Sequence, residues 1–203
     1  MSTKVVIIGA FVEIIELAEE SGLKILGLID NSKKREYLGY PILGNDEDAK
    51  EILSKNKKIS VIISPDLPET REKLHQRYKG IGFDFTGIVS NFSKVSKSTQ
   101  IGEGTVIQAL VNVSSECIIG DFVKLNTLCN IMHNSFIGNY TTVAPNAVIL
   151  GNVSIGSRCY IGANATVLPN LNIADDVVIG AGAVVTKSIF EIGVYVGCPA
   201  KKL

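Results

Sequence analysis

Two residues of this sequence have the types and the spacing for acyl transfer. His133 is one of only two histidines in the chain of 203 residues, and Gly151 follows it by 18 positions (151 − 133). An imidazole can act as a general base toward an amine or a hydroxyl. A backbone N–H beside it can stabilise the oxyanion that forms on a thioester carbonyl, and a glycine lets the acyl group approach closely. The pair works only if the fold brings both residues together.

A repeat of six residues predicts such a fold. Branched aliphatic residues occupy every sixth position from Ile101 to Val185, without insertion or deletion, and small residues or glycines flank most of them. This period is typical of a parallel β-helix whose inward aliphatics stack in columns, while glycines and small residues turn the corners. Three sides make a coil of eighteen residues, and adjacent strands lie about 4.8 Å apart. Gly151 is therefore expected one coil beyond His133, which lies near a corner and faces outward.

The first part of the chain has a different pattern. Apolar segments at 4–10, 24–30 and 58–64 predict strands, and amphipathic or capped segments at 12–22, 45–56 and 67–80 predict helices. This alternation is typical of a small parallel α/β sheet of Rossmann type, in which ligands bind beyond the carboxyl ends of the strands. That edge contains Gly9, Ala10, Asp30 and Ser64. We therefore predict a Rossmann-like α/β domain over 1–86 and a β-helix over 87–203.

Composition excludes several classes of protein. Lysines plus arginines equal aspartates plus glutamates at 20 each, so no net charge favours nucleic acid or an anionic membrane. The four cysteines lack the spacing of a zinc site, and we expect no metal. No apolar run is long enough to span a membrane, and the N-terminus is not typical of a signal peptide. We expect a cytoplasmic protein with reduced thiols.

The hexapeptide pattern resembles the left-handed β-helix acyltransferases over about residues 87–203. The order of a small α/β domain and a hexapeptide helix, together with the stretch LPNLNIADDVVIGAGAVVTK and the ending GVYVGCPAKKL, is similar to sugar acetyltransferases. These include the sialic acid O-acetyltransferases and the bacterial UDP-4-amino-sugar N-acetyltransferases. The resemblance implies a left-handed β-helix, a homotrimer and an acetyl-CoA-dependent acetyltransferase that acts on an amino or hydroxyl group of a nucleotide-linked sugar.

The resemblance also implies roles for individual residues. His133 matches the general base, and Gly151 matches the glycine that offers its amide to the acetyl carbonyl in a direct transfer. Acetyl-CoA is expected to lie along the solenoid between neighbouring subunits. The matching positions are Gly151, Ala163, Ala181, Gly182, Lys187, Pro199 and Lys201.

Three departures from the family pattern affect these expectations. Asn134 follows the histidine where the family usually has a carboxylate, so we expect a weaker base or a carboxylate from elsewhere. Thr142 stands where the family often has a second histidine. The turn at Gly9 and Ala10 is short and has lost the glycines that would hold a phosphate. The first domain is therefore expected to bind an unusual nucleotide sugar or a sugar without a nucleotide, or to be structural.

The same sequence bears on other classes of protein. A carbonic anhydrase needs three histidine ligands, and the repeat contains one histidine. A catalytically weak or inactive sugar- and CoA-binding subunit remains an alternative, as does an acetyltransferase for a non-sugar acceptor. Cys117, Cys129 and Cys159 occupy the small-residue column and are expected to pack in the core. His75, on the third helix, is expected to be a surface residue.

Overall fold

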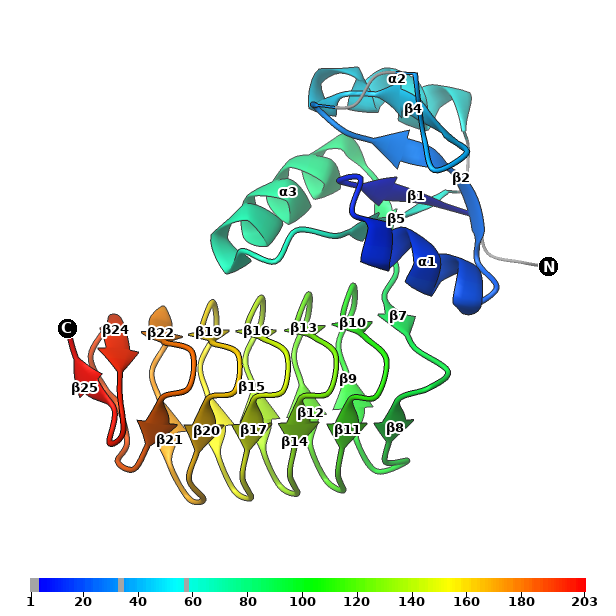
Figure 1. Cartoon of the computed structure of the whole chain (residues 1–203). Helices are drawn as coiled ribbons and strands as arrows, with labels where there is room; N and C mark the ends of the chain where they lie inside the picture. The colour runs from blue at the N-terminus through cyan, green and yellow to red at the C-terminus, as the bar shows by residue number, and fades with distance from the viewer. Residues whose placement is uncertain (1–3, 33–34, 57–58) are drawn as a thin grey trace.

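The computed structural model describes residues 4–32, 35–56 and 59–203. It has two parts, an α/β domain and a long β-helix (Figure 1). The α/β domain has a six-stranded sheet in the order β3-β4-β2-β1-β5-β6. All neighbouring strands are parallel except the pair β3 and β4. The strands are β1 Lys4–Ile8, β2 Lys24–Ile29, β3 Glu36–Tyr37, β4 Tyr40–Gly44, β5 Ser60–Ile63 and β6 Asp84–Phe85.

Helices cover both faces of this sheet. They are α1 Val12–Glu20, the 3-10 turn η1 Asp46–Asp48, α2 Ala49–Lys55 and α3 Pro68–Ile81. Alternate side chains of β1 point to opposite faces, so Val5 and Ile7 pack with α1 while Val6 and Ile8 pack with α2 and α3. Asn45 forms the predicted cap and accepts a hydrogen bond from the Glu47 N–H. The Rossmann-like sheet predicted from the sequence is confirmed.

Two local predictions in this domain need adjustment. The third helix does not end within the predicted segment 67–80 but continues to Ile81, because Gly82 supplies the left-handed conformation (φ +105°) that terminates it. The short strand pair β3 and β4 was not predicted from the sequence. Lys58, the first residue of the predicted third strand, lies outside the described residues, and the observed strand begins at Ser60.

The β-helix is a triangular prism whose three faces are parallel sheets. The first face contains β7 Ile88–Val89, β10 Val106–Ile107, β13 Lys124–Leu125, β16 Thr142–Val143, β19 Tyr160–Ile161, β22 Val177–Ile179, β24 Gly193–Val196 and the antiparallel β25 Lys201–Lys202. The second face contains β8 Lys94–Val95, β11 Asn112–Val113, β14 Asn130–Ile131, β17 Val148–Ile149, β20 Thr166–Val167 and β23 Val184–Val185. The third face contains β9 Gln100–Ile101, β12 Ile118–Ile119, β15 Phe136–Ile137, β18 Ser154–Ile155 and β21 Asn172–Ile173.

The predicted period of eighteen residues is confirmed by the strand register. Leu125 pairs with Val143 and Ile131 pairs with Ile149, each one coil apart. The aliphatic column and the small-residue column are buried together in one core, which includes the three cysteines expected there. Burial raises the pKa of the Cys129 thiol to about 12 and that of Cys159 to about 11, so neither is a nucleophile.

The corners differ from the sequence prediction. Most residues with positive φ at the corners are not glycines; Asn134, Tyr140 and Arg158 are examples, with φ between 57° and 61°. The glycines that follow the aliphatics serve close packing between coils instead. A Cβ on Gly138 would lie 2.5 Å from the backbone of the next coil. The corners are therefore open to many side chains, and the glycines set how closely the coils stack.

The corners line up in three edges along the solenoid. We call them the histidine edge, the domain edge and the third edge. The histidine edge, with corner residues Glu116, Asn134, Asn152 and Asn170, joins the second face to the third. The domain edge, with Gly104, Phe122, Tyr140, Arg158 and Asp176, joins the third face to the first. The third edge, with Leu110, Leu128, Asn146, Asn164 and Gly182, joins the first face to the second.

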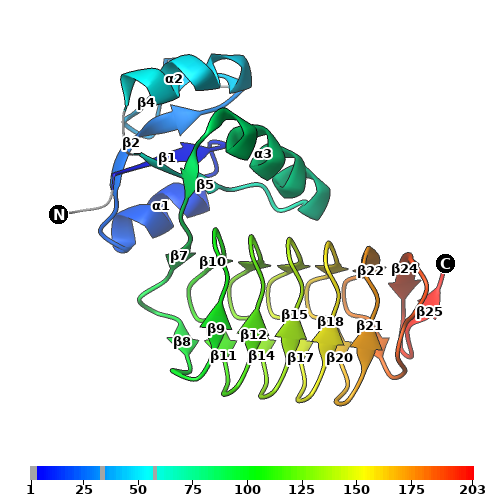
Figure 2. The same ribbon diagram turned by 180° about the vertical axis from the view of Figure 1, so that it is seen from behind.

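The α/β domain lies over the first face and the domain edge, whereas the loops of the histidine edge form the opposite margin (Figures 1 and 2). Buried polar contacts fix this arrangement. Lys124, only 1% exposed, donates to the Ser64 carbonyl and pairs with Asp66 at 2.9 Å. Arg71, 2% exposed, donates to the carbonyls of Phe122, Pro65, Asp66 and Tyr140.

His75 is not the surface residue that the sequence suggested. It is 8% exposed and stacks on Phe122, with ring centroids 4.0 Å apart. Its Nδ1 lies 2.7 Å from the Tyr140 hydroxyl. The helix turns this histidine toward the domain edge of the solenoid, where corner aromatics bury it.

Candidate active site

His133 and Gly151 lie together on the histidine edge, as the period of eighteen requires. The imidazole is exposed and covers the glycine, which is buried. A Cβ on Gly151 would lie 2.7 Å from His133 Cε1 and 2.8 Å from Nε2. Real Cβ atoms do not approach other atoms so closely. The histidine can adopt this position only because residue 151 has no side chain.

The Gly151 N–H is free of protein acceptors among the described residues. At some other corners the equivalent N–H has a side-chain acceptor: the N–H of Asp121 donates to Asn139, that of Ser157 to Asp175, and that of Thr127 to Gln108. On the histidine edge, the equivalent N–H groups of Ser115 and His133 also have no acceptor among the described residues. At Gly151 the position one coil further on is Pro169, which has no acceptor side chain. The N–H of Gly151 therefore has no acceptor among the described residues and lies beside an imidazole.

Asn134 orients the imidazole. Its side-chain oxygen lies 2.9 Å from His133 Nδ1, and its amide nitrogen donates to Glu116 Oε2 at 2.7 Å. Asn134 and Glu116 are corner residues of successive coils and are both exposed. The bond to Nδ1 leaves Nε2 as the nitrogen that can accept a proton from a substrate.

The residues expected to bind acetyl-CoA fall on two edges and at the C-terminal end. Gly151 and Lys187 lie along the histidine edge, whereas Ala163, Ala181 and Gly182 lie along the third edge. These two edges border the same second face. Pro199 and Lys201 belong to the terminal β24–β25 hairpin and are exposed. Nothing within 4 Å would meet a Cβ on Gly182, so the surface above it is open.

The residues expected at the carboxyl edge of the α/β sheet also lie together. Gly9 and Asp30 line a cavity of about 290 Å³. The Asp30 carboxylate accepts hydrogen bonds from the Ala10 N–H at 2.8 Å and from the N–H and hydroxyl of Ser32. Ser64 is buried beneath the turn, where its hydroxyl bonds to the carbonyls of Ile8 and Gly9. Ser64 therefore supports the turn, while Asp30 faces the cavity.

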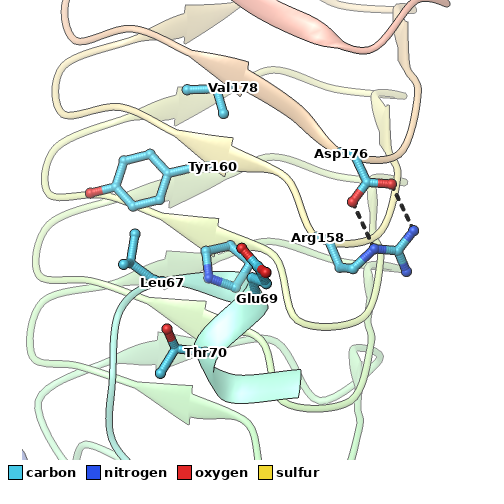
Figure 3. Close-up of a pocket in the computed structure, with 8 residues that line it drawn as sticks. Leu67, Glu69, Thr70, Arg158, Tyr160, Asp176 and Val178 are labelled. Atoms are coloured by element: carbon cyan, nitrogen blue, oxygen red, sulfur yellow. Dashed lines mark hydrogen bonds and ion pairs between the residues drawn. The ribbon is translucent and has the colours of Figure 1, made fainter. Parts of the chain in front are cut away.

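A second, larger cavity of about 440 Å³ lies between the start of α3 and the first face of the solenoid. The apolar side chains of Leu67, Tyr160 and Val178 border it, and an ion pair between Arg158 and Asp176 lies at one side (Figure 3). That pair raises the pKa of Arg158 and lowers that of Asp176. Thr70 borders both cavities, so they adjoin one another.

Thr142 faces the α/β domain and does not face His133. Its hydroxyl donates to the Asp66 carbonyl at 2.6 Å, and the side chain is fully buried. Three other solenoid residues that hold the domain were not predicted from the sequence: Phe122, Lys124 and Tyr140. The available signal was Lys124 itself, which lies beside the inward Leu125 of the aliphatic repeat. A lysine that becomes buried there needs a partner.

The described part of the chain has neither a metal-binding cluster nor a membrane-spanning helix. Between residues 4 and 203, leaving out 33–34 and 57–58, no group of three histidine, cysteine or carboxylate side chains could hold a metal ion. Over the same ranges, no helix has the length and apolar character needed to cross a membrane.

Comparisons with known proteins agree with this architecture. The model of the bacterial transferase hexapeptide repeat matches residues 134–169 and 152–187, and the model of the PglD N-terminal domain matches residues 4–78. The chain therefore combines a PglD-type N-terminal domain with bacterial transferase hexapeptide repeats. With the structural neighbours described below, this combination supports an acetyl-CoA-dependent sugar acetyltransferase.

Three solved structures illustrate the likeness. A histidine-to-asparagine variant of perosamine N-acetyltransferase from Caulobacter crescentus, in complex with CoA and GDP-perosamine, has a TM-score of 0.94 and 27% identity, and the match covers 98% of this chain and 96% of that one. The acetyltransferase domain of PglB from Neisseria gonorrhoeae, in complex with acetyl coenzyme A, has a TM-score of 0.92 and 25% identity over 100% of both chains. WeeI from Acinetobacter baumannii has a TM-score of 0.90 and 27% identity over 100% of both chains. No curated protein matches the chain by sequence.

Proposed function

We propose that this acetyl-CoA-dependent sugar acetyltransferase acts on the amino group of a nucleotide-linked amino sugar, with His133 as the general base and the Gly151 N–H as the oxyanion donor. One observation carries the proposal. An exposed imidazole lies directly over a glycine whose N–H has no acceptor in the described part of the chain. A base and a fixed donor at one place are what attack on a thioester requires.

The reaction is a direct transfer. His133 Nε2 removes a proton from the acceptor amine as its nitrogen attacks the thioester carbonyl carbon. The Gly151 N–H stabilises the oxyanion of the tetrahedral intermediate. The intermediate then expels the CoA thiolate, and the imidazolium returns the proton to that sulfur. The products are the acetamido sugar and free CoA, and no acyl-enzyme forms.

An amine is favoured over a hydroxyl for two reasons. The perosamine enzyme named above is an N-acetyltransferase and was solved with GDP-perosamine. In addition, His133 has an amide rather than a carboxylate as its direct partner. An amine is a good nucleophile once deprotonated, so it tolerates a weaker base than a hydroxyl does.

The adjoining cavities suggest how the acceptor binds. We propose that Asp30, with Gly9 and Ala10, receives the nucleoside end in the smaller cavity. A carboxylate that lines this cavity is the kind of acceptor that a sugar hydroxyl or a base N–H would bind. The sugar then extends past Thr70 toward the larger cavity at Tyr160 and Val178.

One subunit does not place base and acceptor together. The histidine edge is the margin of the prism opposite the first face, and the α/β domain with both cavities lies on that first face. We therefore propose a homotrimer in which the histidine edge of one subunit faces the acceptor cavities of its neighbour, with acetyl-CoA bound between them. We expect the protein to act in the cytoplasm, in keeping with its four free thiols.

The test is release of CoA thiol from acetyl-CoA with a panel of acceptors. The panel contains UDP-linked 4-amino sugars, GDP-perosamine, other nucleotide-linked amino sugars and free sialic acids. We expect turnover with one nucleotide-linked amino sugar, and His133→Ala should lower kcat about 100-fold or more. Lys97→Ala, at the equivalent exposed corner position two coils earlier, is the matched control and should keep full activity.

Two results would contradict the proposal. Near-normal turnover by His133→Ala would remove this histidine from its role as the base. Failure of every acceptor, with acetyl-CoA still bound, would favour a binding subunit or a non-sugar acceptor instead.

A further inference from the structure

A carboxylate stands behind the histidine, although the residue next to it in sequence is an asparagine. The chain of contacts runs from His133 Nδ1 to the Asn134 side-chain oxygen at 2.9 Å and from the Asn134 amide nitrogen to Glu116 Oε2 at 2.7 Å. Glu116 precedes Asn134 by one full coil (134 − 116 = 18). The β-helix therefore places three side chains in a row along the histidine edge.

Because a carboxylate only accepts hydrogen bonds, it determines which group donates and which accepts at each contact of the row. An ionised glutamate can accept hydrogen bonds but cannot donate one. Glu116 must therefore receive the N–H of the Asn134 amide, which turns the amide oxygen toward His133. That oxygen can only accept, so Nδ1 of the imidazole must carry the proton. Nε2 is left with its lone pair, the form that a general base needs.

A similar contact elsewhere shows what is special here. On the third edge, Asn146 donates to Asn164 at 2.6 Å, again one coil apart. That pair of amides has no carboxylate at one end and no imidazole at the other, so nothing fixes its direction. Stacked polar corners are thus a general feature of the repeat. Only the histidine edge, among the described corners, joins such a pair to a titratable ring.

We propose that Glu116 is a positioning residue that acts through Asn134 to hold His133 in the Nδ1-protonated tautomer. This role rests on the proposed function of His133 as the base. A substitution of Glu116 by glutamine would remove the negative charge and would no longer fix which group donates in the hydrogen bond to Asn134. A glutamine can donate to the Asn134 oxygen, so the Asn134 amide can turn over and present its N–H to Nδ1. The imidazole would then carry its proton on Nε2 and could not act as the base.

The experiment combines kinetics with nitrogen-15 NMR of the histidine side chains. The chain has only two histidines, and buried His75 serves as the internal reference. In the wild-type protein we expect His133 to be protonated on Nδ1 at neutral pH. In Glu116→Gln we expect a mixture of tautomers, and kcat should fall by about tenfold or more with little change in KM for acetyl-CoA, since a general base contributes about 100-fold or more. Glu103→Gln removes an exposed carboxylate from the domain edge and should leave both readouts unchanged.

A rescue variant separates positioning from simple structural damage. In Glu116→Gln combined with Asn134→Asp, the new carboxylate accepts directly from Nδ1–H, so the tautomer and kcat should return to near wild-type values. A Glu116→Gln protein with an unchanged tautomer and unchanged kcat would overturn the proposal, as would failure of the rescue. If no acceptor supports turnover, the proposed function fails, but the NMR spectra still decide whether Glu116 sets the tautomer.

Discussion

The histidine edge and the domain edge share one backbone but serve opposite purposes. Both are built from left-handed corners that repeat every eighteen residues. On the domain edge the corners carry Phe122 and Tyr140, which are covered by α3 and tied to Arg71. On the histidine edge the corners carry Glu116 and Asn134, which stay exposed. The repeat thus fixes where each corner residue lies. The side chain at that corner determines whether it packs against the α/β domain or stays exposed beside the proposed base.

The two histidines of the chain make the same contrast. His133 is exposed with Nε2 available, whereas His75 is buried among aromatic rings. Among the described residues, His75 Nε2 has no hydrogen-bond partner. Burial lowers the pKa of His75, and nearby Lys79 lowers it further. One imidazole is placed to exchange protons, and the other is kept neutral.

Breaking the domain edge should have the largest effect on stability. Arg71→Met leaves four carbonyls without their donor, and we expect the free energy of unfolding to fall by about 3 kcal/mol or more. Burial lowers the pKa of Arg71 to about 10, so it remains charged at neutral pH. Denaturant unfolding measures the change. Arg77→Met, an exposed arginine of the same helix, should change stability by at most about 1 kcal/mol. Equal losses of stability in Arg71→Met and Arg77→Met would contradict the structural role assigned to Arg71 at the domain edge.

Breaking the histidine edge should affect turnover while leaving the fold intact. In Gly151→Ala the new Cβ would displace the imidazole, and because a shift of about 1 Å in a catalytic group can cost 100-fold, we expect kcat to fall by about that factor. The unfolding midpoint should hardly change, because the exposed ring can move away.

A double variant sharpens this prediction. If Gly151→Ala acts by moving the ring, then adding it to His133→Ala should cost little further activity, since the two effects are coupled. A full additional loss in the double variant would show that residue 151 acts independently of His133.

The smallest expected effect is a pH dependence of the free energy of unfolding, which arises from His75 at the domain edge. A histidine in an unfolded chain titrates near pH 6.5, and the pKa of His75 in the folded chain is lower. Between those two values the unfolded state binds more protons, so the free energy of unfolding should fall as the pH drops below about 6.5. His75→Phe keeps the ring stack and should flatten this dependence between pH 7 and 5. An unchanged slope in His75→Phe would refute the assignment.

Much of the solenoid could be predicted because its signal is local and repeated. The aliphatic column fixes the register, and the register alone brings Gly151 beneath His133. Glu116 was also within reach, since it stands eighteen residues before Asn134, but an exposed glutamate at a corner is usually just a solvated charge.

The misjudged residues depend on contacts between the two parts of the chain. Whether His75 is buried depends on how α3 packs against the solenoid, and no periodicity records that packing. Thr142 could be recognised as a departure from the family pattern, but its bond to Asp66 links residues 76 positions apart. The corner residues were misjudged for another reason. The backbone strain of a left-handed non-glycine residue is offset by the hydrogen bonds of neighbouring coils, which a propensity cannot include.

The spacing of Glu116, Asn134 and Gly151 also bears on how such a protein can change length. The three residues belong to successive coils, and each coil contacts only the coils beside it. Duplication or loss of a whole unit of eighteen residues outside these coils would lengthen or shorten the prism and leave the three residues aligned. A whole coil inserted between them would separate them along the same edge, and six or twelve extra repeat residues would move one of them to a different edge. Changes in length that preserve the proposed site are therefore changes by complete coils outside residues 116–151.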